Sequence, residues 1–494
     1  MSTSIDVLII GAGPTGLGAA KRLNHLKKLS WHLVDHQENA GGLSCTQLTP
    51  EGFLYDMGVH VTFSHYKYYD DCLDEALPNE DDWFKHRRYS LIFVKDRWIP
   101  YPLQNNICLL SQDDQVKCVD GLIDARLNPV KSCLTFDDWI LQKTGIGIAD
   151  VFMRPYNEKI WTLPPREMQH KWVGERVAEP DCKTIIKNII YHIAETGWGP
   201  TAVFRFSARG GTGQIWKSVA KTLPKENQSY GSGYKVESIN AAEKIATLSN
   251  GTTIKYKHLI STMPLQLLLK SMNNTDLLPL AESLFYTHTH VVCVGVRGET
   301  LERAVNGTWH YFPDSNSPFY RATIYSNFSP YNVPPKEHKL PTLQYASKSI
   351  EESPSKEPKE GPYWSMILEI AESSRKTVDT ATLLQDCLDG LLIANLLEPK
   401  SEIVTLHHKV CKYGYPVPTL NRDEILDKIL PKLKEQGIYS RGRFGSWKYE
   451  VANQDHSFML GVEAIDSIIY GSPELTLNYP DLINSRNNSE RRLE

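Results

Sequence analysis

The sequence predicts an α/β fold, and three observations support this. An apolar stretch at residues 5–10, IDVLII, leads directly into the glycine-rich segment GAGPTG, a helical pattern and a second strand, WHLVD, which ends at Asp35. Residues 105–196 contain several segments in which apolar residues recur at helical spacing. Segments such as YSLIFVKDRWIPYP and HVVCVGVRG have the composition of strands in an antiparallel sheet. Together they predict a Rossmann-like unit combined with a helical domain and an antiparallel-sheet domain.

The first βαβ unit has the spacing that a bound dinucleotide requires. Gly11 allows the tight turn after the strand, Gly13 lets the backbone approach a pyrophosphate, and Gly16 lets the helix pack on the strand. The helix N-terminus then faces the phosphates, and Asp35 accepts hydrogen bonds from ribose hydroxyls. Because strand, glycines, helix and acidic strand end occur in the required order, we interpret this segment as a dinucleotide-binding fingerprint.

Two further segments favour FAD over NAD as the dinucleotide. A second glycine pair, which includes Gly42, follows the acidic strand end in ENAGGLSCT. FAD-dependent folds of the amine-oxidase type use such a pair where the chain passes the cofactor. Near the C-terminus, GRFGSWKYEVANQDHSFMLGVEAID offers a glycine-rich turn and a helix suited to the flavin end. These segments predict a Rossmann-like unit that is split by insertions and completed by the C-terminal part of the chain.

Composition and charge exclude several classes of protein. The 494 residues are 41% hydrophobic, which suffices for a large core and exceeds one simple domain. The net charge of −4 gives no basis for binding nucleic acid or an anionic membrane, and no apolar run reaches the ~18 residues of a membrane span. The nine cysteines include no CxxC pair, so we expect reduced thiols and no metal site, in a cytoplasmic protein without a signal peptide.

We expect three discontinuous domains and a short C-terminal tail. The FAD-binding domain takes residues 1–74, 203–275 and 441–485; the helical domain takes 105–202; the sheet domain takes 75–104 and 276–440; the tail is 486–494.

Motifs along nearly the whole chain resemble one family. HVTFSHYKYYDDC, PYPLQNNI, YNEKIWTLPPREMQ, WVGERV, FRFSARGGTG, SPFYRATIYSNFSPYN, GYPVPT and GRFGSWKYEVANQDHSFM resemble segments of UDP-galactopyranose mutases of the eukaryotic (fungal and protist) type, in the same order. The resemblance implies an isomerase of galactofuranose biosynthesis that interconverts UDP-galactopyranose and UDP-galactofuranose. It implies that only reduced FAD is active, with NADPH or NADH as reductant. It also implies that flavin N5 attacks the anomeric carbon with UDP as the leaving group, and that the net reaction is redox-neutral. The family includes tetramers and monomers.

A diphosphate leaving group requires fixed cations. Arginine suits this role because its planar fork pairs with phosphate oxygens bidentately and stays charged. Arg176 in WVGERV and Arg321 in FYRATIY match the family's two diphosphate arginines, and we expect both to be catalytic. Tyr311, Tyr415 and Tyr449 match family tyrosines whose hydroxyls donate to the diphosphate.

The resemblance places the remaining site residues in three groups. The flavin group is Gly58, Val59, His60, Arg88, Arg443 and Gln454, with His60 packed on the ring and catalytic. The uridine group is Tyr101, Gln104, Asn157 and Trp161. The sugar group is Phe63, Thr201 and Asn453. No side chain is required as a general base, and we interpret His65 as structural.

The chain departs from the family pattern at several positions near the ligands. Val59 replaces the second glycine of a Gly-Gly-His loop, Leu103 replaces an aromatic residue, and Thr201 replaces an asparagine. Gln214 and Ala452 stand where the family has glycine. These departures keep open a divergent enzyme that acts on another nucleotide sugar or on a biosynthetic intermediate.

Two other functions fit the same fold. A flavin oxidase or desaturase would have no use for paired diphosphate arginines. A non-catalytic binding protein like the Rab GDP-dissociation inhibitors would have a degraded dinucleotide fingerprint, whereas GAGPTG is intact here.

Overall fold

A seven-stranded sheet holds the N-terminal βαβ unit in the computed structural model, which describes residues 3–129, 132–179, 181–196, 202–302, 304–486 and 488. Strands β1, β2, β9, β12 and β19 pair in parallel, and β10 and β11 add an antiparallel edge. Their bounds are β1 Thr3–Ile10, β2 Trp31–Asp35, β9 Gln228–Tyr230, β10 Val236–Asn240, β11 Ile245–Leu248, β12 Thr253–Ser261 and β19 Ile438–Ser440. The antiparallel edge is the meander that turn signals between residues 230 and 261 indicate.

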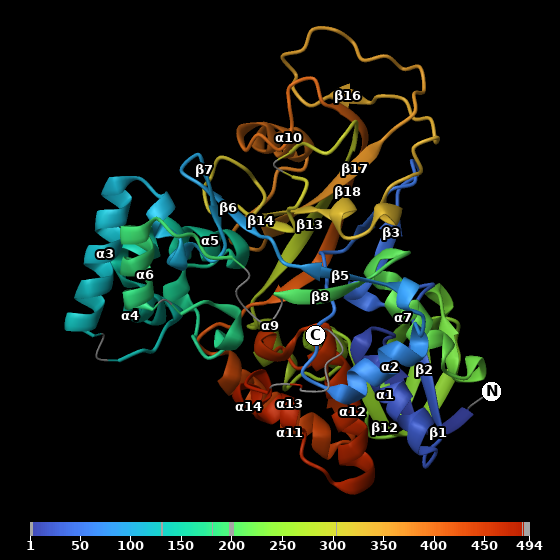
Figure 1. Ribbon diagram of the computed structural model, residues 1–494. Helices are drawn as coiled ribbons and strands as arrows, with labels where there is room; N and C mark the ends of the chain where they lie inside the picture. The colour runs from blue at the N-terminus through green and yellow to red at the C-terminus, as the bar shows by residue number, and fades with distance from the viewer. Residues whose placement is uncertain are drawn as a thin grey trace.

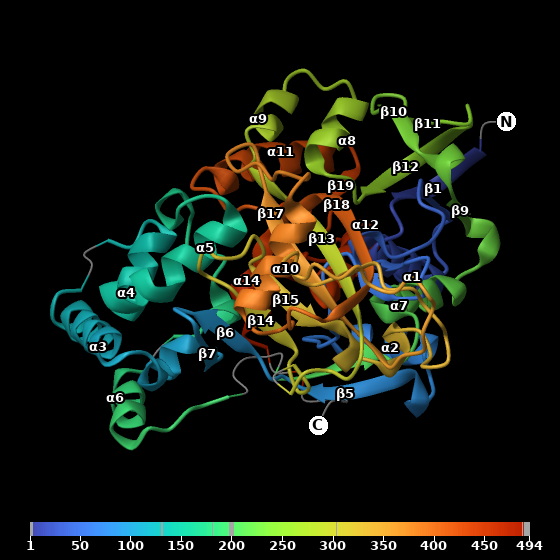
Figure 2. The same ribbon diagram turned by 90° about the horizontal axis from the view of Figure 1, so that it is seen from above.

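Helices cover both faces of this sheet (Figures 1 and 2). One face carries α1 (Pro14–Leu26), α2 (Lys67–Ala76), α7 (Gly211–Lys221) and α12 (Gln454–Tyr470). The other carries α8 (Leu265–Ser271), α9 (Leu278–Glu282) and α11 (Arg422–Glu435). Helices α1 and α12 pack at very short range, because a Cβ added to Gly461 would lie 1.9 Å from the Thr15 carbonyl oxygen. The C-terminal segment therefore lies directly against the N-terminal unit.

A second, eight-stranded sheet forms among the described residues, in the order β16-β18-β13-β17-β15-β14-β6-β7. Its bounds are β6 Leu91–Val94, β7 Arg97–Pro100, β13 Tyr286–Arg297, β14 Trp309–Tyr311, β15 Arg321–Ile324, β16 Gln344–Tyr345, β17 Tyr363–Glu372 and β18 Glu402–Pro416. All pairs are antiparallel except β14 with β6. Helix α10 (Leu383–Ile393) covers its outer face. Residues of the opposite face, such as Cys293 and Ile367, share a core with residues 53–59 and with the helical part.

The helical part projects to one side of the two sheets (Figure 1). It contains α3 (Gln112–Leu127), α4 (Phe136–Ile148), α5 (Arg154–Trp161) and α6 (Cys182–Tyr191). Each of three helices begins at a residue whose side chain accepts a backbone N–H, namely Ser111, Thr135 and Asp181. Within the described residues, no helix combines the length and the hydropathy that crossing a bilayer would take. All nine cysteines lie within the described residues and are free.

Short elements link these parts. They are β3 (Thr46–Leu48), β4 (Leu54–Asp56), β5 (Trp83–Arg87), β8 (Val203–Ser207), α13 (Leu475–Asn478) and α14 (Pro480–Asn484). The pairing of two short strands differs from the domain grouping that we expected from the sequence. Strand β5 pairs with β8 and not with the eight-stranded sheet, although we expected 75–104 to join that sheet. Strand β19 pairs with β12, and α11 packs beside it, although we expected 276–440 to belong wholly to the sheet domain. Both pairings join residues far apart in sequence, which local periodicity does not encode.

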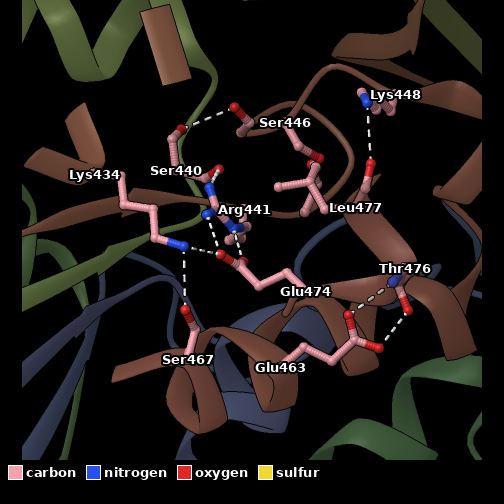
Figure 3. A network of polar contacts seen from close by, with 12 residues as sticks. Lys434, Ser440, Arg441, Ser446, Lys448, Glu463, Ser467, Glu474, Thr476 and Leu477 are labelled. Carbon is pink, nitrogen blue, oxygen red and sulfur yellow. Dashed lines mark hydrogen bonds and ion pairs between the residues drawn. The ribbon is translucent and has the colours of Figure 1, made fainter. Parts of the chain in front are cut away.

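A buried ion pair anchors the segment that follows β19 (Figure 3). The Arg441 Nε lies 2.5 Å from Glu474 Oε2, and its Nη2 lies 2.8 Å from Oε1. Each of these side chains is 2% exposed. Lys434 Nζ adds a contact of 3.0 Å to the same carboxylate from the surface. The ion pair therefore fixes the start of the turn that carries Arg443 towards the second sheet.

Replacing Glu474 with glutamine is expected to lower the free energy of unfolding by about 3–5 kcal/mol, because the Arg441 guanidinium would stay buried without a counter-charge. The matched control is Lys434→Met, which removes a side chain that is 45% exposed and should cost at most about 1 kcal/mol. Urea unfolding followed by circular dichroism measures both. Equal losses for the two variants would contradict the assignment of stability to the buried pair.

Candidate active site

A cavity of about 220 Å³ lies where the two sheets meet. Its walls come from residues 57–63, from β14, β15, β17 and β18, and from residues 443–454. The fold brings many of the predicted site residues to its lining: Gly58, Val59, His60, Phe63, Arg88, Tyr311, Arg321, Tyr415, Arg443, Tyr449, Asn453 and Gln454. Residues from distant parts of the chain therefore meet in one place, and their roles remain predictions.

Arg321 enters the cavity from β15 and is held by an acid that the sequence analysis missed. Its Nε and Nη2 donate to the two carboxylate oxygens of Glu369 at 2.8 and 2.7 Å. Glu369 is 1% exposed, lies on β17 and accepts a further hydrogen bond of 2.9 Å from the Tyr320 hydroxyl. The bidentate pair fixes the orientation of the guanidinium. The single acidic residue inside the apolar run YWSMILEIA was the signal that could have identified Glu369.

Arg176 has the opposite environment. Its guanidinium carbon lies 5.4 Å from the centre of the Tyr449 ring, and Tyr449 lines the cavity. Both terminal nitrogens of Arg176 are buried, and neither has a hydrogen-bond partner among the residues that the structure describes. A buried cation without a partner is costly. An anionic ligand would remove this cost, so the geometry indicates an anion site beside Tyr449.

Two more arginines face the cavity. Arg88 Nη2 donates to the Tyr311 hydroxyl at 2.9 Å, and its guanidinium carbon lies 4.3 Å from the Tyr101 ring centre. Arg443 donates to the Gly414 carbonyl at 3.0 Å and lies 4.6 Å from the Tyr415 ring centre. Among the described lining residues, Glu369 is the only acid. The cavity is therefore positively charged and suits a substrate with more than one negative charge.

The loop at 58–60 forms one wall of the cavity. Gly58 has a φ of +101°, which favours glycine, whereas Val59 is not among the described residues with positive φ. A valine therefore fits here without backbone strain. Burial lowers the pKa of His60 to about 4, so its ring is neutral near pH 7. The His60 Nδ1 is buried and has no partner within the described part of the chain. A neutral ring at the wall, with its Nδ1 unpartnered, suits contact with a flat ligand.

The predicted uridine residues lie behind the cavity and do not line it. The Trp161 indole N–H donates to Asn157 at 3.1 Å, and the Asn157 amide donates to the Met153 carbonyl at 2.7 Å. The Trp161 ring meets that of Tyr449 edge-on, with centroids 4.8 Å apart. Gln104 is 2% exposed and donates to the Ala178 carbonyl at 3.3 Å. In this structure these side chains support the tyrosines of the cavity. Thr201 lies outside the described residues.

The predicted dinucleotide cradle opens towards the cavity. Gly13 and Gly42 face each other so closely that a Cβ on Gly42 would lie 3.1 Å from the Gly13 Cα. Helix α1 begins at Gly13 without a side-chain cap, so its first N–H groups can bind an anion. The Asp35 carboxylate accepts the backbone N–H of Ala12 at 2.7 Å. Leu43, directly after Gly42, lines the cavity. The cradle thus reaches the edge of the cavity at Leu43, which suits an extended dinucleotide with a flat ring at its far end.

The positive end of a second helix also reaches the cavity. Asn453 precedes α12 without a side-chain cap, and both Asn453 and Gln454 line the cavity. Unsatisfied N–H groups at a helix N-terminus stabilise negative charge. This arrangement fits FAD, because the reduced isoalloxazine ring carries negative charge on its pyrimidine side. The donor set and the glycine cradle both suit this cofactor.

Sequence reasoning also missed other lining residues. Trp309 and Thr289 both line the cavity. The Trp309 indole Nε1 and the Thr289 hydroxyl are buried, and neither has a hydrogen-bond partner among the described residues. Cys411 lines the cavity as well, and burial raises the pKa of its thiol to about 11. Only the folding of β13, β14 and β18 into one sheet brings these three side chains together, so no local signal pointed to them.

His65 has a structural environment at the edge of the site. Its Nδ1 lies 2.7 Å from Asp455 Oδ2, and its ring stacks on that of His456 with centroids 4.8 Å apart. The three buried side chains form a cluster of ligand-type atoms at the start of α12. Burial lowers the pKa of His456 to about 3, which keeps that ring neutral. The cluster joins the loop after residue 60 to the helix that begins at the cavity.

Parts of the chain are similar to known proteins in sequence. Residues 9–76 match the NAD(P)-binding Rossmann-like domain family. A ferredoxin–NADP reductase of Wolbachia sp. subsp. Brugia malayi is 26% identical over 140 residues, which span 27% of this chain and 39% of the reductase. The flavin-containing amine oxidase of Oncorhynchus mykiss is 24% identical over 303 residues, which span 57% of this chain and 54% of the oxidase. The chain thus covers less than two thirds of either relative.

Solved structures match over the full length. Wild-type putrescine oxidase bound to putrescine superposes with a TM-score of 0.60 at 12% identity, over 95% of this chain and 100% of the oxidase. This match confirms the predicted amine-oxidase type of fold. The crystal structure of a reduced UDP-galactopyranose mutase superposes with a TM-score of 0.89 at 41% identity, over 97% of each chain. Because this identity extends over nearly all of both chains, the protein belongs to the UDP-galactopyranose mutase family.

Proposed function

We propose that this flavoprotein, a member of a family of isomerases, interconverts UDP-galactopyranose and UDP-galactofuranose without net oxidation or reduction. The observation that carries the proposal is a pair of arginines, Arg321 in the cavity lining and Arg176 beside the lining residue Tyr449. Arg321 is oriented by Glu369, and the terminal nitrogens of Arg176 are buried without a described partner. Two such cations fit a diphosphate that has to leave a sugar and return to it.

The chain would supply binding and electrostatics while the cofactor supplies the chemistry. Bound in its reduced form, FAD would supply the nucleophilic nitrogen that displaces UDP from the anomeric carbon. Gly13, Gly42 and the start of α1 would hold its diphosphate, and Asn453 and Gln454 would hold the flavin end. Arg176 and Arg321 would hold the UDP diphosphate, with hydroxyl donors from the cavity tyrosines.

The charge of the cavity argues against an amine oxidase on the same fold. An amine substrate is a cation at neutral pH, whereas Arg88, Arg321 and Arg443 line the cavity and Glu369 is its only described acid. Glu369 is already paired with Arg321. The low pKa of His60 makes its ring a weak base near pH 7, which also fits a mechanism that requires no general base from the protein.

The test is an anaerobic conversion. The purified protein is checked for bound FAD, reduced with dithionite, mixed with UDP-galactofuranose, and its products are separated by chromatography. We expect UDP-galactopyranose from reduced protein and none from oxidised protein. Reduction by NADPH and by NADH is compared in the same anaerobic cell, because we propose one of them as the physiological reductant. Absence of bound flavin, or equal conversion by oxidised protein, would overturn the proposal.

A second candidate is a related reaction on another nucleotide sugar. It is favoured by Val59 and Ala452, which line the cavity where the family pattern has glycine. The same assay separates the two candidates. Loss of conversion with FAD bound and UDP binding intact would favour this second candidate, and Val59→Gly would then be tested for recovery.

A further inference from the structure

The loop that faces the cavity has two differently fixed stems. Its first stem is β4, which ends at Asp56, a residue with no exposed surface. Its second stem begins at Thr62, whose backbone N–H and carbonyl both pair with Arg205 at 3.0 Å. Gln454 donates to the Val61 carbonyl at 3.2 Å. The Met57 N–H donates to the Cys45 carbonyl at 3.3 Å. Residues 58–60 are therefore the part of the loop that lies between these fixed points.

One buried hydroxyl connects the first stem to the loop. Thr212, at the start of α7, is fully buried. Its Oγ1 lies 2.6 Å from Asp56 Oδ2 and 2.8 Å from the His60 carbonyl oxygen. The other carboxylate oxygen of Asp56 accepts the hydroxyl of Thr46 at 2.5 Å. No other side-chain hydrogen bond to the His60 carbonyl is present within the described residues.

A hydroxyl group carries one proton, so Thr212 cannot donate to both acceptors at once. When Asp56 is ionised, its carboxylate competes with the His60 carbonyl for that proton, and the charged acceptor forms the stronger bond. When Asp56 is protonated, it donates to Thr212 Oγ1, and the hydroxyl proton is then free to bond the His60 carbonyl. The protonation of one buried carboxyl thus decides whether the loop is tethered.

The environment of Asp56 allows this change near neutral pH. Burial raises the pKa of Asp56 to about 6. The titratable groups that face it are Tyr325 and Cys45, and burial raises the pKa of both. His60, at the tethered end, has a pKa of about 4. None of these three groups titrates near pH 6, so a change there is assigned to Asp56.

We propose that Thr212 and Asp56 are positioning residues that latch the cavity-facing loop through the carbonyl of His60. The latch is closed when Asp56 donates to Thr212 and open when the Asp56 carboxylate takes the Thr212 proton. Its catalytic meaning rests on the proposed function, because the loop wall at Gly58 and His60 is the one assigned to the flavin. The latch itself is a property of the chain that can be measured without turnover.

The test measures hydrogen exchange of the amides at 57–61 in the FAD-loaded protein, corrected for intrinsic rates, between pH 5 and pH 8. Four proteins are compared: the natural chain, Thr212→Ser, Thr212→Val and Asp56→Asn. Flavin content and melting temperature are recorded for each. Thr212→Ser keeps the hydroxyl, and Thr212→Val keeps the volume without it. Asp56→Asn can accept from Thr46 and donate to Thr212 at every pH, which mimics the closed latch.

In the natural chain, protection of these amides is expected to rise as the pH falls through about 6. Thr212→Ser should show the same profile. In Thr212→Val these amides should exchange roughly two- to tenfold faster than in the natural chain at low pH, because one hydrogen bond to the loop is lost. Their protection should not depend on pH. Asp56→Asn should remain protected at all pH values. In conversion assays, Thr212→Val should differ from the natural chain in kcat, while its KM for the UDP-sugar should stay nearly the same.

Three results would overturn the latch. They are identical profiles for Thr212→Val and the natural chain, a serine variant that behaves like valine, and an asparagine variant that retains the pH dependence. If Thr212→Val does not fold, the serine and asparagine variants still decide the question. Normal loop exchange with no conversion would count against the proposed function and leave the latch intact.

Discussion

Replacing Arg176 with alanine is expected to lower kcat/KM for the UDP-sugar by about 10²- to 10³-fold, the usual cost of removing a charge-stabilising donor. The melting temperature should stay the same or rise slightly. In the described structure the two terminal nitrogens of Arg176 are buried and have no partner, so the guanidinium contributes no ion pair to the fold. Its removal relieves an unpaired buried charge while it removes a ligand contact.

The measurement combines steady-state kinetics of reduced protein with thermal unfolding. Arg126→Ala is the matched control, because Arg126 is exposed and donates to the Gln142 carbonyl far from the cavity. The control should alter neither kinetics nor stability. A fall in melting temperature for Arg176→Ala, with kinetics unchanged, would show that Arg176 is structural and not a ligand-binding cation.

Replacing Arg321 with leucine is expected to lower both activity and stability. The activity loss should match or exceed that of Arg176→Ala, since Arg321 lines the cavity itself. The unfolding free energy should fall by about 3–5 kcal/mol, because Glu369 is 1% exposed and would lose its bidentate partner. The two arginines therefore differ in what they do for the fold, although both are assigned to the same diphosphate.

A double variant separates these two losses. In Arg321→Leu with Glu369→Met, neither charge remains buried, so most of the stability should return. Activity should stay low, because no cation has been restored. Urea unfolding and conversion assays are compared across the natural chain, the single variant and the double variant. Recovery of activity in the double variant would contradict a role for Arg321 in binding the diphosphate.

The nucleotide-binding unit was readable from the sequence because its physics is local. Strand, glycine turn and helix follow one another within about 30 residues, and the spacing of Gly11, Gly13 and Gly16 reflects backbone contacts made inside that segment. The helix starts at Ser111 and Thr135 are equally local, since each side chain bonds a residue three positions ahead. The resemblance of motifs likewise identified Arg176 and Arg321 as candidate diphosphate ligands, because a motif can be recognised from the sequence alone.

Only the tertiary structure decided how these residues are paired. Nothing in WVGERV or FYRATIY says that Arg321 has a buried carboxylate partner while Arg176 has no described one. The pairing of β19 with β12 and of β5 with β8 was likewise missed, because such short strands have no pattern of their own. A shared hydroxyl between Asp56 and His60 depends on α7 reaching both the first stem and the loop that follows it. Periodicity and motifs record what a residue is and what lies next to it in sequence, whereas ionisation and pairing depend on groups that only folding brings into contact.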